Sequence, residues 1–566
     1  MNHLIYTDQP QASYPIVFLV PYLNKGEIDK HYLAPFGVNK DAVLCLSLHY
    51  APGKKKTPMK EMRQYIDEEL GKELIESGAK YVMCADAEYF KALTKLSKAE
   101  PYLGYACDSQ YGDYKVFYIP NYKAVFYDPE KVTAKIEQAM RALVSLAEDR
   151  YEIPGSNVIR YGEYPRNPED IEQWLIKLLE MDCPLTIDIE AFSLKAPKAG
   201  IGTISFAWNQ HEGIAFPVDY FEEEWTEGEG AAKVKYYGKQ VKNEPVRAML
   251  KQFFRLYMQK AIYHNIAFDA NVLIYQLFMT DIIDTEGLLE GISVMLKNWD
   301  CTKLVSYLAT NSCAGNTLGL KAQSQEFTGN YAEDEICDIR KIPLDRLLKY
   351  NLIDSLATWF VHTKNYGRMV ADQQAAIYHT LFQPSTLDIV QMQLTGLPVN
   401  MKRIKEVNKI LQKEHSEALD EILKNPVVQR FTHQLDEAYV AKMHAKWVKK
   451  RITVAEANQT FNPNSPDQLQ ALLFDMLGLP ILARTKTKLP STDADTLKAL
   501  VHHTDKPDVK KFLTSLLKFK SVDTILTTFM PALLDAVPGP DGWHYLCGNF
   551  NLGGTVSGRL SSSDPK

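Results

Sequence analysis

The run PLTIDIEAF, residues 184–192, places two carboxylates inside a stretch that is otherwise mostly apolar. Side chains alternate between the two faces of a strand, so the leucine and isoleucines share one face while Asp188 and Glu190 share the other with Thr186. Two neighbouring carboxylates repel each other unless water solvates them or a divalent cation neutralises them. The run therefore indicates a strand with one buried face and a second face that meets either water or a cation.

Two further segments carry candidate chemistry downstream. The run AIYHNIAFDANVLIYQLF (261–278) predicts a short strand followed by a helix that contains Asp269. The run LLKYNLIDSLATWFVH (347–362) predicts a helix in which Tyr350 and Asp354, four residues apart, share one face. Taken singly, Asp269 is typical of a helix start and a Tyr/Asp pair is typical of a core tyrosine with its partner.

The chain is long enough for three or four domains. Shifts in pattern and Pro/Gly/Asn-rich stretches predict an α/β domain, a linker, a second domain and a mostly helical remainder. The expected bounds are 1–150, 151–170, 171–375 and 376–566.

Local patterns give more specific expectations. Residues 42–50 and 80–89 are strand-like, and 57–77 are helix-like. Short runs at 184–192, 200–208 and 213–221 predict an antiparallel meander, followed by an acidic surface insertion at 222–233. Two serines, Ser465 and Ser491, are expected as helix N-caps.

Composition excludes several classes of protein. The 46% apolar and 24% charged shares are those of a globular chain, and the eight cysteines include no Cys-x-x-Cys pair. This argues against a zinc knuckle or a disulfide scaffold and predicts a reducing cytoplasm. No apolar run is long enough for a membrane span, and the start lacks a signal-peptide pattern. The net charge is −6, although residues 401–530 hold 21 Lys+Arg against 15 Asp+Glu.

Taken in order, the three motifs resemble the DEDD exonucleases, and specifically their tyrosine branch. This resemblance implies an RNase-H-like domain with a mixed sheet and helices, and a catalytic set of Asp188, Glu190, Asp269, Tyr350 and Asp354. Two divalent ions, Mg²⁺ or Mn²⁺, would be held by the four carboxylates, and Tyr350 would orient the attacking water. The implied reaction is 3′→5′ removal of nucleotides from DNA.

The resemblance also suggests DNA-contacting residues near that site. Asn265 and Phe268 are expected to contact or stack on the 3′-terminal nucleotides. His264 is left open between a structural role and a place near the substrate.

From residue 384 onward the chain resembles family-A, polymerase-I-like DNA polymerases, phage members most of all. The runs FNPNSPDQLQALLFDMLGLP and KTKLPSTDADTL are similar to the family's thumb, and NFNLGGTVSGRLSSSDPK to the start of its palm. Arg559, Ser561 and Ser562 would contact the primer–template there. Residues 516–529 lack the family's usual Arg and Lys-Leu pattern.

The same resemblance implies an incomplete polymerase site. The family's fingers helix and palm aspartates would follow this sequence, and the one carboxylate side chain after residue 545 is Asp564. The expectation is therefore a chain that does not polymerise DNA alone and is completed by a separate C-terminal partner. If phage-encoded, it would act in the host cytoplasm.

Two alternatives remain beside the proofreading exonuclease. One is a non-catalytic subunit that clamps DNA for a split polymerase. The other, a ribonuclease of the same superfamily, is disfavoured because the thumb and palm motifs are those of DNA polymerases. The first 150 residues are faintly similar to uracil-DNA-glycosylase-like domains but lack a matching catalytic pattern, which favours a structural or partner-binding role.

Overall fold

The structure is a computed structural model and describes residues 2–50, 57–228, 230, 233–310, 317–331, 338–446, 452–485, 487–555 and 557–563. Its contacts divide the chain into two compact units. The larger unit comprises Met1–Thr280, Asp284–Leu394 and Leu552–Ser561, and the smaller unit comprises Asp281–Ile283, Thr395–Asn551 and Ser562–Lys566. Each unit has its own hydrophobic core, and each is treated separately below.

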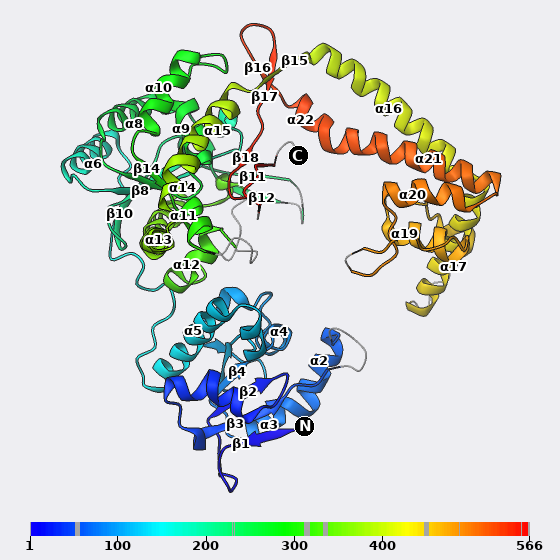
Figure 1. Cartoon of the computed structure of the whole chain (residues 1–566), viewed down its shortest axis with the longest axis horizontal. Coiled ribbons are helices and arrows are strands. Elements are labelled where there is room, and N and C mark those ends of the chain that lie inside the picture. Colours follow the sequence, from blue (N-terminus) through cyan, green and yellow to red (C-terminus); the bar gives the residue numbers. More distant parts are fainter. Residues whose placement is uncertain are drawn as a thin grey trace. The chain divides into compact units, whose positions relative to one another are not determined.

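The larger unit begins with a six-stranded sheet in the order β1-β3-β2-β4-β6-β5 (Figure 1). The four inner strands are parallel and almost wholly buried, as expected for a sheet covered on both faces, whereas the two edge strands are antiparallel. The strands are β1 (His3–Ile5), β2 (Ile16–Val20), β3 (Val43–Ser47), β4 (Tyr81–Cys84), β5 (Cys107–Asp108) and β6 (Lys115–Tyr118). The α/β organisation predicted for this region is confirmed.

Helices of this first region match the predicted helical stretch. Residues 57–77 form α2 (Met59–Tyr65), a π-helical turn (Ile66–Leu70) and α3 (Gly71–Glu76) in succession. They are followed by α4 (Ala87–Thr94) and the long α5 (Pro129–Ala147), both capped by an aspartate, Asp86 and Asp128, whose carboxylate accepts backbone N–H groups. Their apolar faces complete a core that includes Phe18, Tyr32, Phe90 and Met140.

A second six-stranded sheet, in the order β14-β13-β8-β9-β10-β7, carries the candidate site. Its strands are β7 (Tyr161–Glu163), β8 (Leu185–Glu190), β9 (Thr203–Ala207), β10 (Glu212–Pro217), β13 (Ala261–Tyr263) and β14 (Trp299–Cys301). The antiparallel meander β8-β9-β10 is confirmed. Strand β7 pairs parallel with β10, so the expected linker 151–170 contributes a strand to this sheet. A strand of three residues has too little pattern to be recognised in a Pro/Gly-rich context.

Helices cover both faces of this sheet (Figure 1). On one face, α6 (Pro168–Glu180) and α8 (Glu244–Leu256) pack against Leu185, Ile187 and Ile189. The other face meets the 28-residue α13 (Leu344–Ala371). Small polar residues let this helix approach closely: the Thr203 hydroxyl donates to Asn351 Oδ1 at 2.9 Å, and the Ser205 and Ser355 hydroxyls lie 2.7 Å apart. The alternation predicted from the sequence thus separates an apolar face from a polar one.

Hydrogen bonds connect the region of the first sheet to α12 (Leu320–Thr328) and to the residues just after it. Gln138 of α5 donates to Gln325 of α12 at 2.8 Å, and the Tyr105 hydroxyl accepts the Asn330 N–H at 2.6 Å. The remaining helices of this unit are α7 (Ala196–Ala199), α9 (Ile266–Leu277), α10 (Thr285–Met295), α11 (Thr302–Ala309), α14 (Ala375–Ile377) and α15 (Gln383–Thr395). Val390 and Leu394 of α15 belong to the core of the second sheet, so this unit extends past the boundary expected at 375.

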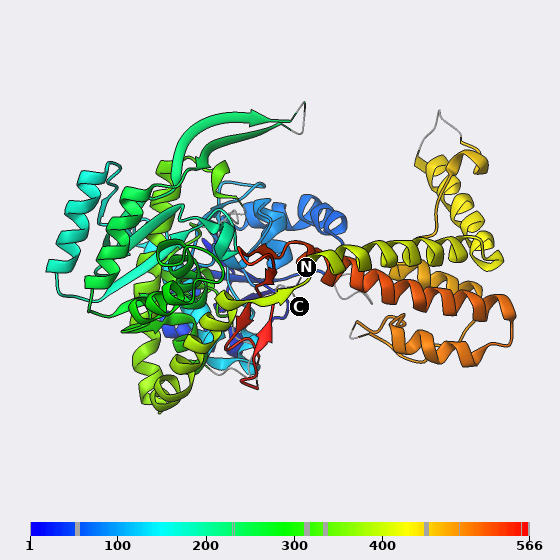
Figure 2. The ribbon, with the colours of Figure 1, turned by 90° about the horizontal axis from the view of Figure 1, so that it is seen from above.

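The acidic segment expected as an insertion has regular structure where it is described. Strands β11 (Tyr220–Glu227) and β12 (Val234–Gln240) form a two-stranded antiparallel hairpin, visible as a long curved ribbon in Figure 2. Most side chains of β11 are exposed, and its Trp225 stacks on Tyr236 of β12 with ring centroids 4.8 Å apart. Exposure on both faces explains the acidic composition, because such a strand needs no apolar alternation.

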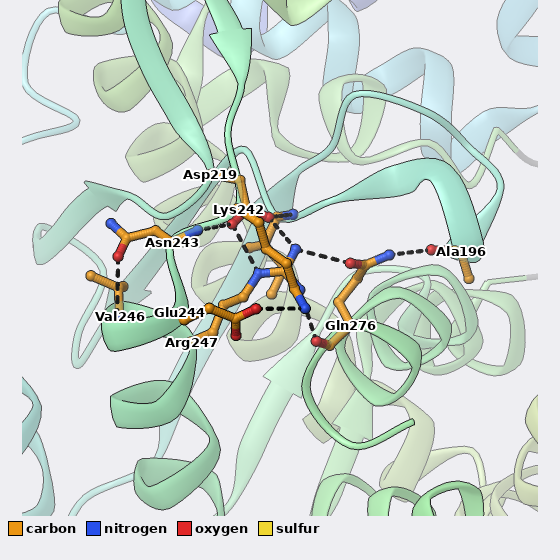
Figure 3. Close-up of polar contacts among 9 residues, drawn as sticks. Ala196, Asp219, Lys242, Asn243, Glu244, Val246, Arg247 and Gln276 are labelled. Carbon is orange, nitrogen blue, oxygen red and sulfur yellow. Dashed lines mark hydrogen bonds and ion pairs between the residues drawn. The ribbon is translucent and has the colours of Figure 1, made fainter. Parts of the chain in front are cut away.

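A buried ion pair secures the base of this hairpin (Figure 3). Asp219 is 0% exposed and Arg247 of α8 is 5% exposed. Two guanidinium nitrogens contact the two carboxylate oxygens, at 2.9 Å for Nε and 2.5 Å for Nη2, and Arg247 also donates to Gln276 of α9. Asp219 further accepts the backbone N–H groups of Ile201 and Asn243. The ion pair thus joins four segments of the domain: the turn before β11, the residues before β9, α8 and α9.

The smaller unit is mostly helical. Its long helices α16 (Met401–Leu423) and α21 (Pro507–Thr524) pack along each other, and Figure 2 shows them as a pair. The other helices are α17 (Pro426–Lys446), α18 (Val454–Ala457), α19 (Pro466–Gln470), α20 (Ala494–Leu500) and α22 (Met530–Leu534). Short strands β15 (Leu397–Val399), β16 (Val537–Pro538) and β17 (His544–Leu546) form a small sheet. A core that includes Phe461, Phe512 and Leu516 holds the helices together.

One of the two predicted N-caps is confirmed in this unit. Ser465 caps α19 by accepting the Gln468 N–H, with Pro466 in the first turn. The prediction for Ser491 is wrong, because Asp493 caps α20 by accepting the Thr496 N–H at 2.8 Å. Ser491 instead donates to the carboxylate of Asp493 at 2.7 Å. The helix starts two residues later than the pattern indicated, and the stronger acceptor takes the cap.

No helix in the described parts of the chain is both long and apolar enough to cross a membrane.

Candidate active site

Three carboxylates meet where β8 faces α13. Asp188 and Glu190 lie two residues apart on the polar face of β8, and Asp354 comes from the buried side of α13. Each offers an oxygen such that all three oxygens lie within 4.8 Å of one another. Residues separated by more than 160 positions are thus brought to one point because α13 packs across the meander.

Asp269 lies beside this group without forming part of the three-oxygen cluster. It is 3% exposed and occupies the first turns of α9. Strand β13 pairs with β8 only at Leu185 and Thr186, which leaves the later amides of β8 without a strand on that side. The Ile189 N–H donates to the Asp269 carboxylate instead. Asp269 is therefore held at the open edge of β8, next to the other three carboxylates.

Electrostatics reflect the crowding of negative charge. Burial, then Asp354 and Asp269, hold the pKa of Asp188 well above its usual range. Burial and Asp354 raise the pKa of Glu190 to about 8, and burial raises that of Asp354 to about 6. Burial also raises the pKa of Asp269, although the amides that it accepts oppose the shift. Four acidic groups in one place, each with a raised pKa, indicate a site that a cation would stabilise.

Tyr350 precedes Asp354 by about one turn of α13 and has two neighbours that the sequence did not single out. The Lys321 ammonium donates to the Tyr350 hydroxyl and lies 4.6 Å from the centre of its ring. The Tyr331 ring packs against Tyr350 with centroids 5.6 Å apart, and its hydroxyl donates to Asp354 Oδ1. Tyr350 is therefore connected to the carboxylate cluster through Tyr331 on one side and hydrogen-bonded to the Lys321 ammonium on the other.

A further residue, Asn351, orients Asp188. Its side-chain N–H donates to Asp188 Oδ2 at 2.6 Å, while its own oxygen accepts the Thr203 hydroxyl. Helical spacing could have identified Asn351, since it precedes Asp354 by three positions and so shares its face. Lys321 and Tyr331 carry no comparable signal, because they come from another helix and the loop after it.

The residues just before Asp269 in the sequence, His264, Asn265 and Phe268, each have defined contacts. The His264 ring contacts the Thr302 hydroxyl at 2.8 Å, and burial, with Lys303, lowers the pKa of His264 to about 3. This favours a neutral structural histidine. Asn265 precedes α9 with a φ of 67° and accepts from Lys303 at 3.0 Å, and Phe268 packs on the core of the second sheet. Contact of Asn265 and Phe268 with DNA stays a prediction.

The residues predicted for the palm, Arg559, Ser561 and Ser562, are not part of the carboxylate cluster. Arg559 is exposed, and its carbonyl accepts the Thr555 hydroxyl at 2.8 Å. Ser561 and Ser562 form β19, which pairs with β18 (Phe550–Asn551). Asp564 lies outside the described residues. Contact of Arg559, Ser561 and Ser562 with primer–template stays a prediction.

The donor set of the cluster suits a hard divalent ion. Mg²⁺ and Mn²⁺ prefer carboxylate oxygens, and the cluster offers oxygens from Asp188, Glu190 and Asp354 with Asp269 beside them. No histidine or cysteine joins the cluster among the described residues. Fold and site together define an α/β protein with a carboxylate group that could bind a divalent metal ion.

Comparison with known proteins finds similarity to one family of enzymes. Residues 432–566 match the model of DNA polymerase family A. DNA polymerase I of Bacillus subtilis (strain 168) is 29% identical over 230 residues, which are 40% of this chain and 21% of that protein. The DNA polymerase of Escherichia phage T5 is 24% identical over 430 residues, which are 72% of this chain and 43% of that protein. This chain is a homologue of the family-A DNA polymerases.

The chain spans less than half the length of these curated relatives. Among solved structures, the POL domain of Pol1 from M. smegmatis in complex with DNA primer-template and dNTP matches with a TM-score of 0.43 at 17% identity. The match covers 71% of this chain and 55% of that one.

Proposed function

We propose that the second sheet and its helices form a metal-dependent 3′→5′ exonuclease that removes nucleotides from DNA 3′ ends within a family-A polymerase. The observation that supports this most is the convergence of Asp188, Glu190 and Asp354 on one point beside Asp269. Four carboxylates enclosed by protein destabilise the fold unless they serve a bound cation. The five residues are also those that the tyrosine branch of the DEDD exonucleases would require.

The carboxylates, Asn351 and Tyr350 would each have a separate role in the reaction. Asp188, Glu190 and Asp354 would hold a divalent ion, and Asp188 with Asp269 a second one. When bound, these ions supply charge neutralisation at the scissile phosphate and a nucleophile at neutral pH. Asn351 keeps the Asp188 carboxylate in a single orientation through its 2.6 Å hydrogen bond. Tyr350, which is connected to Asp354 through Tyr331, would orient the attacking water by a hydrogen bond.

The remaining parts of the chain receive roles by homology and composition. We propose that residues 376–566 form a thumb and the start of a palm that grip primer–template, since 432–566 match the polymerase family. The basic excess within 401–530 suits a phosphate backbone. Arg559, Ser561 and Ser562 would contact DNA near the primer end. For residues 1–150 we propose a structural or partner-binding domain.

A non-catalytic clamping subunit is the competing function. Such a subunit needs a basic surface but no cluster of four carboxylates, whose mutual repulsion weakens both the fold and the attraction for DNA. The cluster therefore favours the exonuclease.

The first test is the activity itself. With Mg²⁺ or Mn²⁺, the purified chain is expected to shorten single-stranded DNA labelled at its 5′ end, producing a ladder that recedes from the 3′ end. EDTA should stop the reaction, and fresh Mg²⁺ should restore it. Immediate release of the 5′ label, or full activity in EDTA, would contradict the proposal.

A milder effect is expected for Tyr350→Phe. The substitution keeps the ring and its packing against Tyr331 but removes the hydroxyl. Loss of one orienting hydrogen bond should reduce the turnover number about 10- to 100-fold. Single-turnover digestion of a 3′-labelled oligonucleotide measures this directly. A rate equal to wild type would show that Tyr350 does not orient the water.

A further inference from the structure

We infer that Lys321 is a positioning residue of the exonuclease site, which holds the Tyr350 hydroxyl in the orientation that directs its proton to the attacking water. This inference rests on the proposed exonuclease function. It starts from a contact between two elements remote in sequence: Lys321 belongs to the first turn of α12, and Tyr350 to α13.

The direction of the hydrogen bond is decided by chemistry. An ammonium group has donors and no acceptor, so the Tyr350 oxygen accepts from Lys321 and keeps its own proton for donation. Without Lys321, the tyrosine hydroxyl could rotate about its C–O bond and point its proton at a carboxylate. The lysine thus selects the orientation in which the hydroxyl donates to a water oxygen.

Two further contacts hold this arrangement. The ammonium lies 4.6 Å from the centre of the Tyr350 ring, and Tyr331 packs on that ring with its hydroxyl bonded to Asp354. α12 is itself anchored, since Gln325 donates to the Leu103 carbonyl at 2.9 Å and bonds Gln138 at 2.8 Å. The lysine is therefore presented from a helix fixed at its other end.

The charge of Lys321 also bears on metal binding. Two divalent ions would balance the four carboxylates. Lys321 acts electrostatically on both Glu190 and Asp354, so its charge lies near the place where those ions would bind. It would repel the cations, so its presence is a cost to metal binding and, through the orientation of Tyr350, a benefit to turnover.

Because Lys321 should weaken metal binding but favour turnover, its replacement should change the two quantities in opposite directions. Lys321→Met should lower kcat about 10-fold with little change in KM for a single-stranded oligonucleotide, because the lost function is orientation. The same variant should bind Mn²⁺ about 2- to 5-fold more tightly in calorimetric titration without DNA, because one positive charge is gone. Lys321→Arg, which keeps charge and donor, should recover most of the turnover. A misfolded variant would instead lose both turnover and Mn²⁺ binding.

A double-mutant cycle separates action through Tyr350 from a direct role. In a Tyr350→Phe background, Lys321→Met should cost less than about 2-fold, since the hydroxyl that it positions is absent. Lys349→Met is the matched control, as Lys349 is an exposed lysine next to Tyr350, and it should leave kcat unchanged. An unchanged kcat for Lys321→Met in an active enzyme, or additive losses in the cycle, would overturn this inference alone. Absence of nuclease activity in the wild type would overturn the proposed function as well.

Discussion

Asp354→Asn is expected to reduce nucleotide release from a DNA 3′ end by about 1,000-fold or more, because it removes one of the three clustered carboxylates that we propose to hold the metal. The asparagine has nearly the same shape, and its amide oxygen can still accept the Tyr331 hydroxyl. DNA binding should persist, since the carboxylate attracts a cation and repels the phosphate. Asp188→Asn should behave alike. Single-turnover rates with Mg²⁺ and fluorescence anisotropy with labelled DNA measure the two quantities.

The stability of the same variants should change in the opposite sense. Without metal, neutralising one of four neighbouring carboxylates relieves repulsion, so Asp354→Asn should melt at a higher temperature than wild type in EDTA. Added Mg²⁺ should then raise the melting temperature of wild type more than that of the variant. Asp372→Asn, at the exposed end of the same helix, is the control and should change neither property. Near-native nuclease activity of Asp354→Asn would show that the cluster is not the active site.

Arg247→Met should destabilise the domain built on the second sheet by about 3–5 kcal/mol, since it leaves a fully buried carboxylate without its cation. Asp219 would keep the amides of Ile201 and Asn243, which offset only part of the loss. The base of the β11–β12 hairpin and the contact between α8 and α9 depend on this pair. Pulse proteolysis in urea, with peptides from 185–394 identified by mass spectrometry, reports the free energy of unfolding of this domain.

The chain contains a matched control for this experiment. Arg255 lies on the same helix and pairs with Glu290 at the surface, so Arg255→Met should cost at most about 1 kcal/mol. Adding Asp219→Asn to Arg247→Met should restore part of the lost stability, because it removes the buried charge. The restoration is incomplete, since the two backbone N–H groups bond different carboxylate oxygens and the amide oxygen can accept only one of them. A cost for Arg247→Met no larger than that of Arg255→Met would contradict the importance of the buried pair.

The sequence predicts those features of the fold and site that depend on residues close together in the chain. Alternation in 184–192 predicts which face of β8 is apolar and that Asp188 and Glu190 share the other. Helical spacing predicts that Tyr350 and Asp354 lie on one side of α13. Both are consequences of backbone geometry over a few residues. The same kind of pattern fails where it is short or absent, as for the three-residue β7 and for β11, most of whose side chains are exposed.

Only the tertiary structure decided that these carboxylates meet at one point, and which residues surround them. Their meeting requires α13 to cross β8 and β9 closely, which small side chains such as Ser205 and Ser355 permit. Lys321 and Tyr331 join the site from α12 and the loop after it, and their neighbours in sequence give no sign of this. A local pattern encodes the direction of a side chain relative to its own strand or helix. The identity of its partner depends on how separate elements pack, and that is settled by burial and close contact across the whole domain.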